Sequence, residues 1–131
     1  MTVAQSDRGG VTNALTIDVE DYFQVSALAS HFPKDVWNST PCRVERNVER
    51  ILEMLARSGA RGTFFTLGWI AERYPELVRQ IVAGGHELAS HGYAHERASD
   101  QSPEAFLADI RLAKVVLEDI GGCEVRGYRA P

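Results

Sequence analysis

Two features of secreted, cross-linked proteins are missing from this sequence of 131 residues. Only two cysteines occur, Cys42 and Cys123, far apart along the chain, and such a pair fits two separate thiols better than a disulfide or a metal site. The first residues are polar and lack the basic-then-apolar pattern of a signal peptide. We therefore expect a disordered lead-in over 1–12, one domain over 13–131, and a cytoplasmic protein.

Long apolar runs and an excess of basic charge are also missing. No stretch is apolar enough to predict a transmembrane segment, and the formal net charge is −4 with both signs interspersed. This charge balance argues against nucleic acid as the main partner. Hydrophobic residues make up 44% of the sequence, enough for the core of one globular domain.

Apolar segments of strand type and of helix type alternate along the chain. Strands are predicted at 14–17, 62–67, 86–89 and 124–129. Helices are predicted from Thr40-Pro41 to Gly59, from Pro75 to Gly84-Gly85, and from Ser102-Pro103 to Gly121-Gly122. Strands joined by helical crossovers indicate an α/β fold with a parallel sheet. In such folds, ligands and catalytic groups gather at the C-terminal ends of the strands.

Two histidines, His91 and His95, follow the third predicted strand four residues apart. Two imidazoles and a carboxylate are a common ligand set for a catalytic divalent metal, and this set suits zinc as well as other first-row metals. The alternative is a pair of surface or core histidines without a ligand. His86 lies at the start of a predicted strand, outside this spacing, and we expect it to be structural.

Charged side chains also stand at the ends of the first and fourth predicted strands. Asp18 is a candidate general base where a buried strand gives way to a loop, with a helix-capping or surface aspartate as the alternative. Glu20 and Asp21 compete to be the carboxylate ligand of the metal, and at least one of them is then a solvated acid. Arg129 can hold a carboxylate ionised with its fork geometry, or it is a surface arginine.

Aromatic residues are concentrated in the long loop after the first predicted strand. Tyr22, Phe23, Phe32 and Trp37 all lie there. Rings beside a polar site are often used to recognise pyranose sugars. Such rings more often attach a long loop to the body of a domain, and this is the interpretation that we favour.

Four segments in order resemble the polysaccharide deacetylases of the NodB homology group, carbohydrate esterase family four. They are TIDVED at 16–21, RGTFF at 61–65, GHELASHGYAH at 85–95 and YRAP at 128–131. The stretch DVEDYFQ at 18–24 resembles the subgroup that accompanies bacterial exopolysaccharide and exosortase systems.

The resemblance implies the N-terminal half of a distorted (β/α) barrel with parallel strands. It also implies a metal-dependent hydrolase, with zinc expected, that removes acetyl groups from an N-acetylated polysaccharide or oligosaccharide. The resemblance implies that Asp18 is the catalytic base and that Arg129 orients it. It also implies that the metal ligands are His91, His95 and one carboxylate, either Glu20 or Asp21, with Glu20 favoured.

The sequence departs from the family pattern in three places, of which Gly92, where many members have serine or threonine, is the least consequential. Val19 separates Asp18 from Glu20, where the commoner motif has two adjacent aspartates. The arginine motif is cut at Pro131, and the family's later histidine, expected to act as general acid, does not follow. We therefore expect a C-terminally incomplete domain, a fragment of a longer protein. Two other functions stay open, a cyclic-amide hydrolase of the same superfamily and a non-catalytic remnant that binds metal or glycan.

Overall fold

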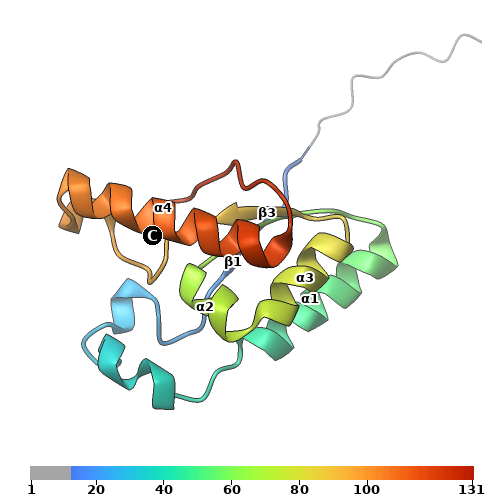
Figure 1. Cartoon of the computed structure of the whole chain (residues 1–131). Coiled ribbons are helices and arrows are strands. Elements are labelled where there is room, and N and C mark those ends of the chain that lie inside the picture. Colours follow the sequence, from blue (N-terminus) through green and yellow to red (C-terminus); the bar gives the residue numbers. More distant parts are fainter. Residues whose placement is uncertain (1–12) are drawn as a thin grey trace, which may run out of the picture.

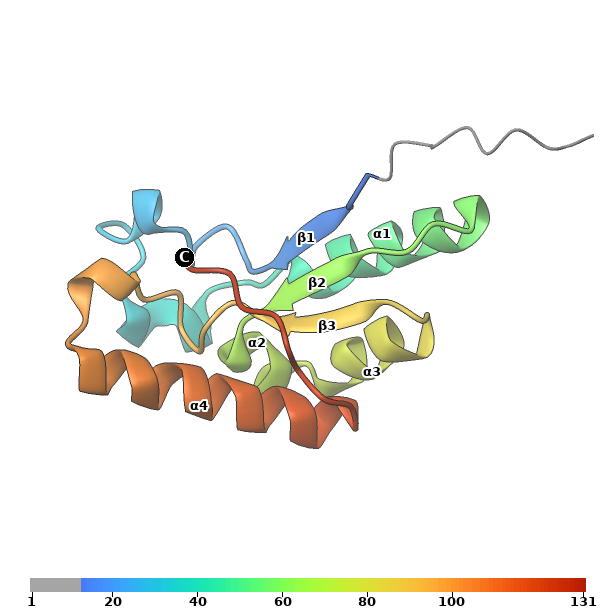
Figure 2. The same ribbon diagram turned by 90° about the horizontal axis from the view of Figure 1, so that it is seen from above.

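A small parallel sheet forms the centre of the chain, and its helices cover one face of that sheet. The computed structural model describes residues 13–131, so the predicted lead-in over 1–12 lies outside the described residues. The two views agree that the helices lie on the same side, while residues 122–131 run past the end of β3 (Figures 1 and 2).

The sheet has three strands in the order β1-β2-β3, all parallel. They are β1 at Thr16–Val19, β2 at Thr63–Thr66 and β3 at Glu87–Ser90. Asp18 pairs with Phe65, and Phe65 pairs with Ala89. Because parallel neighbours need crossover connections, this arrangement confirms the predicted α/β fold.

Within the described residues, four α-helices connect and flank the strands. They are α1 at Val44–Ser58, α2 at Gly68–Arg73, α3 at Pro75–Ala83 and α4 at Pro103–Gly121. Gly59 and Gly122 close α1 and α4 in the left-handed conformation, with φ of 68° and 64°, which confirms the predicted ends. Ser102 caps α4 by accepting a hydrogen bond from the N–H of Ala105 at 3.2 Å.

The hydrophobic core lies between the sheet and the helices. Phe64 of β2 is fully buried among side chains of α1, α2 and α3. Leu88 of β3 packs with Leu117 of α4 and Val125 in a second cluster. Successive strand side chains point to opposite faces, so Phe65 lies on the face that the helices leave uncovered.

Two predicted boundaries are wrong at the N-terminal side. The first strand was predicted at 14–17, but β1 begins at Thr16, and the side chain of Leu15 is 46% exposed. Asp18 therefore lies within β1 rather than after it. The first helix was predicted from Thr40-Pro41 but begins at Val44, where a distant carboxylate, described below, accepts the first backbone N–H groups.

The predicted fourth strand is also wrong, because residues 124–129 form a single parallel bridge, Ser90 with Tyr128. Two side chains of α4 form hydrogen bonds with the backbone N–H and carbonyl of Val125. Glu118 accepts a hydrogen bond from its N–H at 2.9 Å, and Lys114 donates one to its carbonyl at 2.7 Å. Val125 therefore has no backbone group left for a ladder with β3, and pairing is limited to the bonds of Ser90 with Gly127 and Arg129.

Further short elements were not predicted, among them a 3-10 turn at Ala98–Asp100. The aromatic loop contains 3-10 turns at Ser26–Leu28 and Lys34–Ser39, and α2 is too short to show a helical period. Within 13–131, the helices lack the combination of length and apolar character that crossing a bilayer requires.

Candidate metal centre and active site

Glu20, His91 and His95 meet at the C-terminal edge of the sheet. Glu20 directly follows β1, and both histidines follow β3. Each residue has one potential ligand atom, a carboxylate oxygen or an imidazole nitrogen, and these three atoms lie within 4.8 Å of one another. Parallel strands deliver their following residues to the same edge, and this geometry brings Glu20 to histidines that lie 71 and 75 positions later in the sequence.

One carboxylate oxygen of Glu20, Oε2, faces both imidazoles. It lies 2.8 Å from Nε2 of His95 and 3.5 Å from Nε2 of His91. Among the described residues, this buried oxygen has no hydrogen-bond partner, and neither has Nδ1 of His95. Leaving such atoms unpaired costs about 1–3 kcal/mol each. A divalent cation would satisfy a carboxylate oxygen and imidazole nitrogens that converge in this way, so the residues fit a metal.

The orientation of the His91 ring follows from a backbone contact. Its Nδ1 lies 2.9 Å from the carbonyl oxygen of Arg129. Because a carbonyl can only accept, Nδ1 carries the proton, and in the neutral ring Nε2 then presents its lone pair toward Glu20. This is the arrangement that metal-binding histidines commonly adopt.

The turn that carries the histidines is held by α2. The N–H groups of Gly68 and Trp69, in the first turn of α2, donate to the carbonyls of Gly92 and Tyr93 at 2.9 Å each. They thereby satisfy groups that a helix start leaves unpaired. His95 itself has a φ of 54°, a left-handed conformation that is uncommon outside glycine. Strain of this kind is characteristic of functional sites.

Burial and neighbouring groups set the charges of this cluster. Burial raises the pKa of the Glu20 carboxyl, but the two imidazoles outweigh burial and lower it to about 2. Burial lowers the pKa of the His91 imidazole. The contacts with Glu20 and with the Arg129 carbonyl, together with the charge of Asp18, outweigh burial, so the pKa lies above its ordinary value. Glu20 is therefore an anion at neutral pH, as a metal ligand must be.

Asp21, the alternative carboxylate ligand, lies outside the cluster and holds the start of α1. Its Oδ2 accepts hydrogen bonds from the N–H groups of Arg43 at 2.6 Å and Val44 at 2.9 Å, and its Oδ1 accepts from Tyr22 at 2.9 Å. The expectation that one acid of the Glu20–Asp21 pair is solvated is wrong, since Asp21 is 3% exposed.

We expect Asp21→Ala to lower the free energy of unfolding by about 1–3 kcal/mol, because three backbone N–H groups lose their acceptor. Urea unfolding followed by circular dichroism measures this change. Asp119→Ala, at an exposed aspartate of α4, is the matched control. Equal unfolding midpoints for the two variants would show that the carboxylate does not support α1.

Asp18 and Arg129 form an ion pair beside the cluster. Nη1 of Arg129 lies 2.6 Å from Oδ1 of Asp18, and Nη2 donates to the hydroxyl of Thr16 at 2.8 Å. The guanidinium also lies over the ring of Phe65, 4.2 Å from its centroid. Since the Arg129 carbonyl contacts His91, one residue connects the candidate base with the candidate metal ligands.

The aromatic loop is attached to the body by its own rings, as favoured from the sequence. Phe23 is fully buried and contacts the rings of Tyr22, Phe32, Trp37 and Trp69 at centroid distances of 5.4–6.3 Å. The loop is therefore a fixed wall beside the site.

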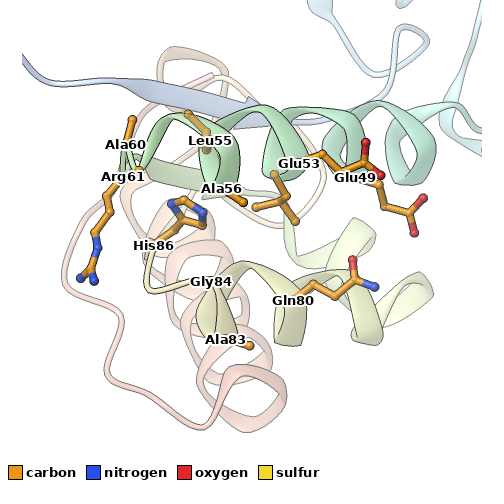
Figure 3. A pocket seen from close by; sticks show the side chains of 12 residues that line it. Glu49, Glu53, Leu55, Ala56, Ala60, Arg61, Gln80, Ala83, Gly84 and His86 are labelled. Carbon is orange, nitrogen blue, oxygen red and sulfur yellow. The ribbon is translucent and has the colours of Figure 1, made fainter.

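His86 lies at the opposite end of the sheet and is structural, as expected. Its Nδ1 accepts a hydrogen bond from the N–H of Gly62 at 3.2 Å, and its ring packs against Phe64. It lines a cavity of about 720 Å³ between α1 and α3, together with Glu53 and Arg61 (Figure 3). This cavity is remote from the histidine pair, because β3 separates His86 from His91.

Known proteins are similar to this chain in sequence and in fold. A chitooligosaccharide deacetylase from Azorhizobium caulinodans is 35% identical over 82 residues, which are 62% of this chain and 39% of that protein. A crystal structure of a putative polysaccharide deacetylase from Mycobacterium smegmatis has a TM-score of 0.74 and 31% identity, covering 90% of this chain and 42% of that one.

Similarity of fold extends to a protein described as lacking activity. A CE4 family pseudoenzyme from Bacillus anthracis has a TM-score of 0.66 and 21% identity, covering 88% of this chain and 33% of that one. Fold alone therefore does not decide activity. The chain also spans 39% of the length of the Azorhizobium relative. Residues 35–131 match the family described as Polysaccharide deacetylase. Because this match extends over most of the sequence, the chain belongs to the polysaccharide deacetylase family.

Proposed function

We propose that this chain supplies the metal centre and the base of a hydrolase that removes N-acetyl groups from an amino-sugar polysaccharide. The observation that carries the proposal is the buried Oε2 of Glu20, which faces two imidazole nitrogens and has no hydrogen-bond partner within residues 13–131. Matching relatives are named as deacetylases of chitooligosaccharide and of peptidoglycan, which supports an N-acetylated glycan as the substrate class.

Glu20, His91 and His95 would hold the metal, and we propose zinc because two imidazoles and a carboxylate form a common catalytic zinc set. When bound, the ion supplies positive charge that polarises a carbonyl and lowers the pKa of water. Proton transfer and the orientation of the reacting groups depend on the side chains.

Asp18 is the proposed base that takes a proton from the attacking water. In the overall reaction the water oxygen bonds to the acetyl carbon, the carbon–nitrogen bond breaks, and acetate and a free amine result. The ion pair with Arg129, with Nη1 2.6 Å from Oδ1, fixes the direction of the second carboxylate oxygen of Asp18. Arg129 is thus a positioning residue for the base.

We further propose bacterial exopolysaccharide as the polymer. The stretch DVEDYFQ over 18–24 supports this assignment through its resemblance to the exosortase-associated subgroup. The cytoplasmic location stays a prediction.

Acetate release from oligomers of N-acetylglucosamine tests the function. We expect the full-length protein to release acetate, to lose this activity in the presence of a chelator, and to regain it when zinc is added back. His91→Ala is expected not to regain it. Absence of release, or release that the chelator leaves unchanged, would refute the proposal.

A further inference from the structure

Residues 91–95, the histidine segment, have a backbone shape that needs support from outside the segment. Gly92 has a φ of 80° and His95 a φ of 54°, so both lie in the left-handed region. His91 and His95 begin and end the segment, and both are proposed metal ligands. The conformation of the segment therefore decides whether the two imidazoles converge on Glu20.

Helix α2 supports the histidine segment through Tyr93. The N–H of Trp69 donates to the carbonyl of Tyr93 at 2.9 Å. The hydroxyl of Tyr93 donates to the carboxylate of Glu72 at 2.6 Å, and this contact, together with burial, raises the pKa of Tyr93 to about 12. The ring of Tyr93 also lies against Gly68, where an added Cβ would come within 2.6 Å of it. These contacts do not involve the backbone N–H of Tyr93.

Asp109 of α4 accepts a hydrogen bond from this N–H. Its Oδ2 lies 3.3 Å from the backbone nitrogen of Tyr93. A Cβ at position 92 would lie 3.0 Å from the same oxygen, so the carboxylate also lies directly against the backbone of Gly92. Helices α2 and α4 pack against each other (Figure 2). The histidine segment is therefore bound by two helices that also fix one another.

The position of Asp109 has a cost for the fold. Burial raises the pKa of its carboxyl, the N–H of Tyr93 lowers it, and the charges of Glu96 and Lys34 act in opposite directions, which leaves a net increase. A carboxyl whose pKa is raised by folding destabilises the folded state at pH values above that pKa, where it is ionised. An ionised acceptor, however, makes a stronger hydrogen bond than a neutral one. The carboxylate thus lowers the stability of the chain while it holds one peptide N–H of the histidine segment firmly.

We propose that Asp109 is a positioning residue for the metal centre, which acts through the backbone of Tyr93 on His91 and His95. The inference rests on the proposed function, since it concerns the ligands of the same metal. Without this acceptor, the left-handed backbone of the segment relaxes, and the two imidazoles no longer converge on Glu20.

The zinc affinity of the full-length protein, measured by competition with a coloured chelator, tests this role. Removal of a group that supports a metal ligand weakens metal binding by roughly 10- to 100-fold. We expect Asp109→Ala to weaken zinc binding by about tenfold, the lower end of this range, because Asp109 acts through the backbone. Asp109→Asn keeps an acceptor in the same place and is expected to bind zinc more like the wild type than like Asp109→Ala.

Ser102→Ala is the matched control for stability. The hydroxyl of Ser102 caps the same helix and accepts from the N–H of Ala105. Its loss is expected to lower the urea midpoint of unfolding and to leave the zinc affinity of the folded protein unchanged. A general loss of stability in α4 would instead weaken zinc binding in both alanine variants.

Amide hydrogen exchange gives a second readout that needs no metal. In the zinc-free protein, the N–H of Tyr93 is expected to exchange faster in Asp109→Ala than in the wild type or in Ser102→Ala, because it has lost its acceptor. Equal exchange rates in all three proteins would overturn the proposed contact.

Zinc binding by the wild type separates the two proposals. A wild-type protein that binds no zinc would refute the metal centre and the role of Asp109 with it. Zinc binding that is equally strong in the wild type, Asp109→Ala and Ser102→Ala would refute the role of Asp109 alone and leave the metal centre in place.

Discussion

Asp18→Asn is expected to lower the rate of acetate release by about 10²–10⁴-fold, the usual contribution of a general base. The amide keeps the shape of the side chain and can still accept from Arg129, but it cannot take a proton from water. The rate is measured with an N-acetylglucosamine tetramer under saturating zinc.

Asp119→Asn is the control, because this aspartate is exposed on α4. Bound zinc, determined in the same samples, verifies that Asp18→Asn still holds its ion. A rate equal to that of the wild type in a zinc-loaded Asp18→Asn protein would mean that another group acts as the base.

Loss of a residue that only hydrogen-bonds to a metal ligand weakens metal binding by roughly 10- to 100-fold. Because Glu20 is itself a proposed ligand, Glu20→Gln is expected to weaken zinc binding by more than this. The substitution removes the negative charge from the centre of the cluster, where Glu20 lies 2.8 Å from one imidazole. Competition with a coloured chelator measures the affinity.

The matched control is Glu53→Gln, since this glutamate lies on α1 beside the remote cavity. We expect it to bind zinc like the wild type. If Glu20→Gln and Glu53→Gln retained the same affinity, the carboxylate would have no part in the site.

The sequence was sufficient to predict the periodic elements and the approach of the site residues. Helix ends at Gly59 and Gly122 follow from local rules, because glycine adopts the left-handed conformation without strain. The meeting of Glu20 with His91 follows from parallel topology, which sends residues after β1 and β3 to one edge.

Features that depend on long-range hydrogen bonds were not predictable in this way. The start of α1 depends on Asp21, which is 23 residues from Val44 in the sequence. The fourth strand fails because α4 side chains take the backbone groups of Val125. The role of α2 as a support for the histidine turn was missed as well, because its six residues carry no period.

Gln24 is the residue of interest that sequence reasoning overlooked. It lay within the DVEDYFQ stretch, but a glutamine next to a loop gives no signal of a buried donor. Its Oε1 accepts from the N–H of Asp21, and its buried Nε2 has no partner in the part of the chain that the structure describes.

The most direct test of the central claim is a zinc titration followed through the imidazole nitrogens by nuclear magnetic resonance. The chain has four histidines, so His31 and His86 serve as internal controls. We predict that the ring signals of His91 and His95 shift together and stop shifting at one zinc per chain, while those of His31 and His86 stay in place. Signals of His91 and His95 that do not respond, or that respond only together with the other two, would contradict a shared metal centre.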